Sequence, residues 1–138
     1  MALVDGIKLL ADLSETEKNN LSLFCQEKLL KAGEVLFYEQ EEASAMYLLK
    51  QGKIEISRIH DGEKIILGEV QAEEILGEMA LFGDANKRMA TATAIEDCVL
   101  VVVLGFSIKE LTSKYPELLD KIKQIINDRS IINKQKLN

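Results

Sequence analysis

Two glycine turns divide residues 45–70 into three short apolar segments, and this pattern limits the folds open to the chain. The turns lie at Gln51-Gly52 and Asp61-Gly62, where glycine supplies the positive φ that a tight turn requires. Between the turns, Ile54 and Ile56 alternate with polar residues, which is the period-2 pattern of a strand buried on one face. The stretch therefore predicts three strands joined by hairpins.

Three further segments have strand character. Residues 28–40 carry short apolar runs around the turn at Ala32-Gly33, residues 91–97 begin with alternating Thr and Ala, and residues 98–104 form a continuous apolar run. The last segment predicts a strand that is buried on both faces. Together the segments predict about eight short strands, and such strands separated by glycine turns are typical of a closed or sandwich-like antiparallel barrel.

One helix is predicted before the strands and one directly after them. Ser14 and Glu17 form a capping-box pattern, which predicts a helix over residues 15–25. Ser107 and Glu110 have the same spacing, so Ser107 is expected to cap a short helix over residues 106–115.

A last helix is predicted from Pro116, because proline suits the first position of a helix. Its apolar residues repeat at helical spacing. On or near one face it carries Leu118, Ile122, Ile125, Ile126, Arg129 and Ile132. This face could be core, a cover over a site, or the seam of a homodimer. Arg129, placed among isoleucines, is interpreted as a surface residue whose charged end reaches solvent, with contact to a ligand as the lesser alternative.

Composition and charge exclude several classes of protein. The 138 residues suit one domain, and the net charge of −6 disfavours nucleic-acid and anionic-membrane partners. The longest apolar run, residues 98–104, is too short to span a bilayer. Cys25 and Cys98 occur without a targeting segment, which indicates reduced thiols rather than a disulfide. We therefore expect a cytoplasmic domain without membrane insertion.

The sequence also lacks the residues that metal or nucleophilic catalysis requires. His60 is the one histidine, and it stands beside the turn at Asp61-Gly62. The sequence contains no CxxC, HExxH or GxSxG motif. We therefore expect no metal site, no cofactor, no catalytic residue and no enzymatic activity.

The segment GEMALFGDANKR, residues 77–88, interrupts the strands and carries the main functional signal. Gly77 suits a positive φ or a close backbone approach. The residues after it can form a helical turn whose first N–H groups have no partners within the helix, and such groups favour an anion. Arg88 adds a forked set of donors suited to phosphate. Glu78 would repel that phosphate unless it accepted hydrogen bonds from another group, such as a sugar hydroxyl.

The segments LGEMAL, residues 76–81, and KRMATATA, residues 87–94, resemble the phosphate-binding cassette of the cyclic nucleotide-binding domain family. That family includes bacterial catabolite activator proteins, regulatory subunits of cAMP-dependent kinase, and cyclic-nucleotide-gated channels. The resemblance covers nearly the whole chain. It implies an eight-stranded antiparallel jelly-roll β-barrel flanked by helices.

The resemblance also implies a division of the chain. Residues 1–28 would be an N-terminal helical part, and residues 29–105 would form the β-barrel, with the phosphate-binding cassette at 76–92. Residues 106–138 would be hinge and lid helices. Members of the family usually signal by moving these helices when ligand arrives, which is a population shift of a two-state element.

Seven residues would then contact a cyclic nucleotide: Gly77, Glu78, Met79, Ala80, Arg88, Met89 and Ala90. Gly77 would lie near the ribose, Glu78 would accept its 2′-OH, and Arg88 would pair with the phosphate. Met79, Ala80 and Ala90 would donate backbone N–H groups. The lid residues would be Ile122, Ile125, Ile126 and Arg129.

Other positions bear on the ligand and its affinity. Met89 stands where members that prefer cGMP often have Thr or Ser, so the resemblance favours cAMP over cGMP as the ligand. The family often has proline where this chain has Lys87, and glycine where it has Glu41. It usually has Gly-Asp in place of Glu73-Glu74, and an aromatic residue in place of Leu76. These departures bear on loop geometry and therefore on affinity.

Three functions remain at this stage. The first is a cyclic-nucleotide sensor that acts on an unidentified protein effector. The second is a ligand-free member of the same fold that serves as an interaction scaffold, which the missing loop glycines support. Taken without the motif, Arg88 would be a structural arginine paired with Glu78 or a neighbouring carboxylate. The third is an enzyme such as a phosphodiesterase, which the single histidine disfavours.

Overall fold

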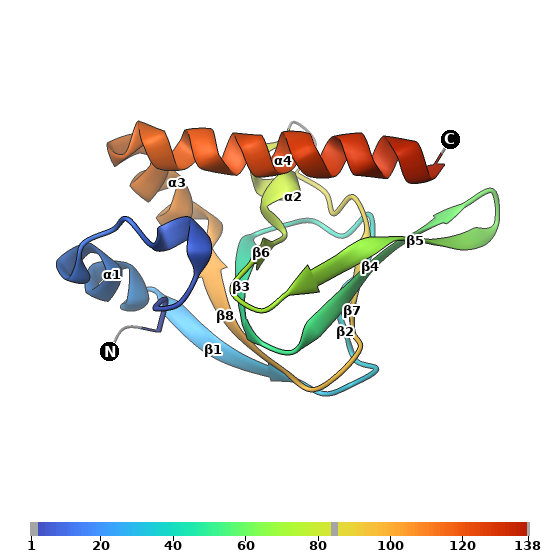
Figure 1. The fold of residues 1–138 in the computed structure, drawn as a ribbon, viewed down its shortest axis with the longest axis horizontal. Coiled ribbons are helices and arrows are strands. Elements are labelled where there is room, and N and C mark those ends of the chain that lie inside the picture. The colour runs from blue at the N-terminus through green and yellow to red at the C-terminus, as the bar shows by residue number, and fades with distance from the viewer. Residues whose placement is uncertain (1–2, 84–85, 138) are drawn as a thin grey trace.

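In the described part of the chain, eight strands form two antiparallel sheets, with helices packed against them (Figure 1). The computed structural model describes residues 3–83 and 86–137. In chain order the elements are η1 Lys8–Leu10, α1 Glu15–Ser22, β1 Cys25–Leu30, β2 Val35–Phe37, β3 Ala45–Gln51, β4 Lys53–His60, β5 Glu63–Gln71, β6 Ile75–Leu76, α2 Glu78–Phe82, β7 Thr91–Ala94, β8 Cys98–Leu104, α3 Gly105–Lys114 and α4 Pro116–Leu137.

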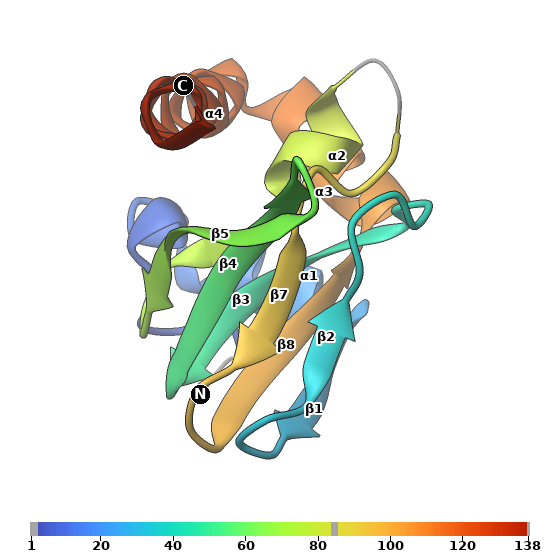
Figure 2. The same cartoon turned by 90° about the vertical axis from the view of Figure 1, so that its right-hand side faces the viewer.

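The two sheets have the orders β1-β8-β3-β6 and β2-β7-β4-β5 (Figure 2). This arrangement confirms the predicted mainly β jelly roll with flanking helices. The glycine turns are confirmed as well. Asp61 and Gly62 have φ values of 53° and 81°, and Gly52 has a φ of 98°. A Cβ atom on Gly52 would lie 2.6 Å from the Asp97 carbonyl oxygen, so glycine is required there.

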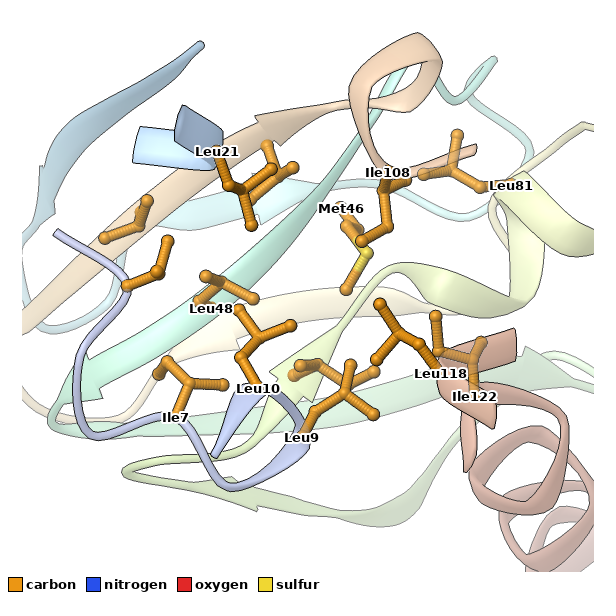
Figure 3. Close-up of a cluster of buried hydrophobic side chains, with 14 of the residues drawn as sticks. Ile7, Leu9, Leu10, Leu21, Met46, Leu48, Leu81, Ile108, Leu118 and Ile122 are labelled. Carbon is orange, nitrogen blue, oxygen red and sulfur yellow. The ribbon is translucent and has the colours of Figure 1, made fainter. Parts of the chain in front are cut away.

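The core has two parts, because β3 and β8 are buried on both faces. Between the sheets lies one cluster of apolar side chains: Leu30, Phe37, Leu49, Ile54, Val70, Leu76, Ala92, Ala94, Cys98 and Leu100. On the other face of the first sheet, Met46 and Val101 pack against the helices and the N-terminal segment. Figure 3 shows this helix-side core, to which α4 contributes Leu118 and Ile122. The prediction that residues 98–104 would be buried on both faces is therefore confirmed.

The capping box at α1 is confirmed, but the predicted end of that helix is wrong. Ser14 Oγ accepts a hydrogen bond from the Glu17 N–H at 3.1 Å, and Glu17 Oε1 accepts one from the Ser14 N–H at 2.9 Å. The helix ends at Ser22 rather than at residue 25. Cys25 instead begins β1, opposite Val103 of β8. Pairing along a whole strand outweighs one more helical turn, so the range 1–28 predicted as helical contains the start of the barrel.

The prediction that Ser107 caps α3 is also wrong. The helix begins at Gly105, so its N-cap residue is Leu104, three residues before Ser107, and no side chain caps it. The Gly105 N–H donates to the Ser44 carbonyl oxygen at 2.8 Å, and a Cβ on Gly105 would lie 3.1 Å from that oxygen. This contact starts the helix directly at the end of β8. Ser107 consequently lies inside the helix and is buried.

The last helix begins at Pro116, as predicted. It crosses above α2, and its C-terminal half runs toward the side on which the turn of the β4–β5 hairpin lies (Figure 1). Leu118 and Ile122 anchor its first half in the helix-side core. No helix among the described residues is long and apolar enough to cross a membrane.

Candidate functional site

A cavity of about 250 Å³ lies where α2, β5 and α4 come together. Its wall includes all seven residues predicted to contact ligand: Gly77, Glu78, Met79, Ala80, Arg88, Met89 and Ala90. Arg129 of the predicted lid also lines it. The other three lid residues lie elsewhere. Ile122 is fully buried in the helix-side core, and Ile125 and Ile126 pack against that core.

Gly77 sets the geometry at the start of α2. Its φ of 84° lies in the left-handed region, where a side chain is strained. A Cβ atom at this position would lie 2.7 Å from Nη1 of Arg88. The absence of a side chain therefore lets the Arg88 guanidinium approach the backbone of the cassette. Both reasons for expecting glycine here, a positive φ and a close approach, are confirmed.

Arg88 is buried and held by backbone oxygens rather than by a carboxylate. Its side chain is 4% exposed. Nη1 donates to the Gly77 carbonyl oxygen at 3.0 Å, and Nη2 donates to the Ala45 carbonyl oxygen at 2.7 Å. Among the described residues no acidic side chain forms an ion pair with Arg88, and its Nε–H has no hydrogen-bond partner. The alternative in which Arg88 pairs with Glu78 is therefore not what the structure shows.

No carboxylate in the described part of the chain lies within ion-pair distance of Arg88. Burial lowers the pKa of Arg88, while the neighbouring Tyr47, Glu41 and Glu78 act to raise it. Guanidinium nevertheless stays protonated in proteins. Because a buried charge is costly unless another charge compensates it, the wall of this cavity favours an anion.

The chain on either side of Arg88 is fixed by the loop before β3. The Arg88 N–H donates to the Glu41 carbonyl oxygen at 2.8 Å, and the Gln40 N–H donates to the Arg88 carbonyl oxygen at 2.9 Å. Lys87 forms a β-bridge with Glu42. Lys87 and Glu41, two of the departures from the family pattern, therefore take part in a regular backbone pairing that supports Arg88.

A third departure keeps the glycine-like conformation without glycine. Glu73 has a φ of 77°. Its N–H donates to the Leu49 carbonyl oxygen at 2.7 Å, and its own carbonyl oxygen accepts from the Lys8 N–H at 3.0 Å. These bonds to β3 and η1 hold the turn in a conformation that costs about 1–2 kcal/mol for a residue with a side chain. At the loop before β3, the positive φ falls on Gln40 (77°) rather than on Glu41.

Glu78 is the second charged group in the site, and it is tied to α4. Its side chain is 2% exposed. Oε1 accepts a hydrogen bond from Nη1 of Arg129, and Oε2 accepts one from the Met79 N–H at 3.1 Å. Burial raises the pKa of Glu78, and Arg129, the Met79 N–H and Arg88 act in the opposite direction. Arg129 is therefore the main positive charge that stabilises the buried, ionised carboxylate of Glu78.

Arg129 is not the solvent-directed surface residue that the sequence indicated. Its side chain is 27% exposed, and Nη2 donates to the Ile75 carbonyl oxygen at 2.7 Å. Arg129 therefore connects α4 to β6 and to the first residue of α2. The helical periodicity placed Arg129 on the correct face, but no pattern in the sequence identified Glu78 as its partner.

Sequence reasoning missed the far wall of the cavity. This wall comes from β2, β4 and β5 and from the second half of α4, and its missed residues are Phe37, Ile56, Leu67, Gly68, Glu69, Val70 and Asn133. Ile132, which also lines it, had been placed on this face of α4 by the helical spacing. A bulge in the β4–β5 pairing places Ile56 opposite Gly68 and Ser57 opposite Ile66. Leu67 is the extra residue at this bulge, and it is buried at the cavity. Strict alternation along the sequence gives no sign of such a shift.

Comparison with known proteins identifies the family of the chain. The sequence profile of the cyclic nucleotide-binding domain matches residues 27–115. The chain belongs to the cyclic nucleotide-binding domain family. The resemblance first seen in the cassette is therefore confirmed.

This cyclic nucleotide-binding domain is similar to several known proteins over most of its own length. It is 30% identical to the cyclic AMP receptor protein of Thermus thermophilus over 112 residues, which cover 80% of this chain and 51% of the receptor. The structure is similar to that of the Thermus thermophilus catabolite activator protein, with a TM-score of 0.79, 26% identity, and coverage of 94% of this chain and 61% of the other.

A third similar structure is the regulatory domain of Toxoplasma gondii PKA with cAMP. It has a TM-score of 0.68 and 28% identity, and covers 74% of this chain and 39% of the other. The chain spans about half or less of the length of the first curated relatives that it matches.

Proposed function

We propose that this domain binds cAMP in preference to cGMP and reports the binding by repositioning α3 and α4. The observation that carries the proposal is the buried guanidinium of Arg88, which lines the cavity without an acidic partner among the described residues. A cyclic phosphate carries one negative charge and would supply the missing counter-ion.

The rest of the wall suits the other parts of a cyclic nucleotide. Glu78 presents a carboxylate that could accept the ribose 2′-OH. Met79, Ala80 and Ala90 line the same cavity and carry backbone N–H groups, of which that of Met79 donates to Glu78 Oε2 in the structure. Apolar residues of β4 and β5 provide a surface for a purine. Charge-assisted hydrogen bonds of roughly 1.5–3 kcal/mol each, together with burial of the base, are sufficient for the roughly −8 kcal/mol of a micromolar complex.

The preference for cAMP rests on Met89. This residue is 48% exposed and lies at the cavity. Its thioether offers at most a weak acceptor and no hydroxyl, so it gives no specific bond to the 2-amino group that distinguishes guanine. Calorimetric titration with cAMP and cGMP tests this point, and tighter binding of cGMP would refute it.

The proposed signal passes through the Glu78–Arg129 pair. A ribose hydroxyl that bonds to Glu78 would change the contact between Glu78 and α4, and α3 is joined to α4 through the helix-side core. Hydrogen exchange with and without cAMP tests the mechanism. The expected result is changed protection in α3 and in the second half of α4. Unchanged protection there, at saturating cAMP, would contradict it.

The proposed role is regulatory rather than catalytic. The groups at the cavity suit binding, and similar proteins include a cyclic AMP receptor protein and the regulatory domain of a PKA. The output would reach an effector protein or a second copy of the chain through α4, where Ile131 and Ile132 are about half exposed.

A further inference from the structure

The guanidinium of Arg88 lies on an aromatic surface formed by two strands. Its central carbon is 4.2 Å from the centre of the Phe37 ring and 5.6 Å from the centre of the Tyr47 ring. The two rings are stacked, with centres 6.0 Å apart and an angle of 29° between their planes. Phe37 comes from β2 and Tyr47 from β3, so the two sheets both contribute to this surface.

The Phe37 ring supplies what the backbone carbonyl oxygens cannot. The Gly77 and Ala45 oxygens fix two N–H directions of Arg88. A ring face adds attraction for the positive charge itself, and this attraction is strongest where water is excluded. Phe37 is 7% exposed and Arg88 is 4% exposed. The ring therefore holds a buried cation in place before any ligand arrives.

We propose that Phe37 is a positioning residue for phosphate binding, acting through Arg88. This inference rests on the proposed function. The ring holds the guanidinium flat, so that its remaining N–H groups are available to the anion without a loss of side-chain freedom on binding. Without the ring, the side chain of Arg88 gains other orientations, and each binding event must order it again.

The proposal predicts that loss of the Phe37 ring weakens binding of a ligand that carries the phosphate, and does not weaken binding of the base and ribose alone. Leucine at position 37 keeps an apolar side chain but removes the ring face, whereas tyrosine keeps the ring. The probes are cAMP, followed by calorimetry, and adenosine, followed by nuclear magnetic resonance titration up to millimolar concentration. Adenosine has the same base and ribose and no phosphate.

We expect Phe37→Leu to weaken cAMP binding about tenfold, in line with the strength of a desolvated cation–π contact, and to leave adenosine binding within about twofold of the wild type. Phe37→Tyr should bind cAMP nearly as the wild type does. Ile54→Ala is the matched control, because Ile54 is buried in the same core cluster and does not line the cavity. It should lower stability while leaving the affinity for cAMP unchanged.

Two results would overturn the assignment of Phe37 alone: wild-type affinity of Phe37→Leu for cAMP, or an equal loss of affinity for cAMP and adenosine. If the wild type binds no cAMP, the proposed function fails and the role of Phe37 fails with it. These outcomes are distinguishable, because the first two require a wild type that binds.

Discussion

Replacing Arg129 by leucine should expose the cost of burying Glu78. The carboxylate of Glu78 is nearly inaccessible to solvent, and Arg129 is its one ion-pair partner among the described residues. Removing one partner of a fully buried pair typically costs 3–5 kcal/mol. Since Arg129 is itself 27% exposed, we expect a loss of ~2–4 kcal/mol in the free energy of unfolding at pH 7.5, measured by urea titration.

The loss should depend on pH in a defined direction. Burial already raises the pKa of Glu78 above its ordinary value of 4.5, and removing Arg129 raises it further. Below pH 4.5 the folded and unfolded chains both carry the proton, and the penalty disappears. As the pH rises toward the raised pKa, the unfolded chain releases its proton first, so stability falls. The Arg129→Leu variant should therefore lose less stability, relative to the wild type, at pH 5 than at pH 7.5.

Two further variants isolate the pair. Lys121 lies on the same helix and forms an ion pair with Asp12, in which the Lys121 side chain is 46% exposed and that of Asp12 is 85% exposed. Lys121→Leu should therefore lower the free energy of unfolding by less than ~1 kcal/mol. Adding Glu78→Gln to Arg129→Leu removes the buried charge and should recover most of the lost stability. Two results would contradict the argument that Arg129 compensates the buried charge of Glu78. The first is a loss in the free energy of unfolding for Arg129→Leu no larger than that for Lys121→Leu, and the second is a loss that does not vary with pH.

Three other predictions follow from the core, a strained turn and a thiol. Ile122→Ala should lower the free energy of unfolding by about 2–5 kcal/mol in urea, because Ile122 is fully buried, whereas Ile131→Ala, at a position 50% exposed, should change it by less than ~0.5 kcal/mol. Glu73→Gly should raise the free energy of unfolding by about 0.5–1 kcal/mol. Glycine removes the strain at φ 77°, about 1–2 kcal/mol, and this gain exceeds the cost of about 0.5–1 kcal/mol that arises because glycine loses more freedom on folding. A decrease would refute this interpretation of the turn. Burial raises the pKa of Cys25 to about 11, so at pH 8 the native protein should react with iodoacetamide far more slowly than the urea-unfolded protein, and equal rates at Cys25 would contradict this.

The sequence was sufficient where short-range chemistry decides the structure. The turns at Gly52 and Gly62 need a positive φ, and the structure has it at both. Pro116 begins α4 because the first position of a helix requires no backbone N–H donor, and proline has none. Gly77 and Arg88 were also found, since a residue without a side chain and a forked donor stand out from their neighbours in the sequence.

Contacts between distant segments were less visible. The end of α1 depends on the pairing of Cys25 with β8, and the start of α3 depends on the bond between Gly105 and Ser44. Strand pairing and backbone contact override the local capping signals in both cases. The Glu78–Arg129 pair joins residues 51 positions apart, and no periodicity within one helix can reveal such a partner.

The aromatic surface beneath Arg88 was missed for a similar reason. Phe37 and Tyr47 belong to different strands, and each looks like an ordinary core residue in its own segment. Their joint contact with the guanidinium appears only when β2 and β3 are brought together. The sequence therefore predicted which residue should hold the phosphate, but not what holds that residue in position.

Thermal unfolding with and without cAMP tests most directly whether Arg88 is the phosphate ligand. At a cAMP concentration of about one hundred times the dissociation constant, binding should add roughly 2.7 kcal/mol of stability to the wild type and raise its midpoint by several degrees. Arg88→Gln keeps a polar side chain but removes the charge, and its midpoint should not respond to cAMP. A wild type that does not respond to millimolar cAMP, or an Arg88→Gln variant that responds as strongly as the wild type, would contradict the account.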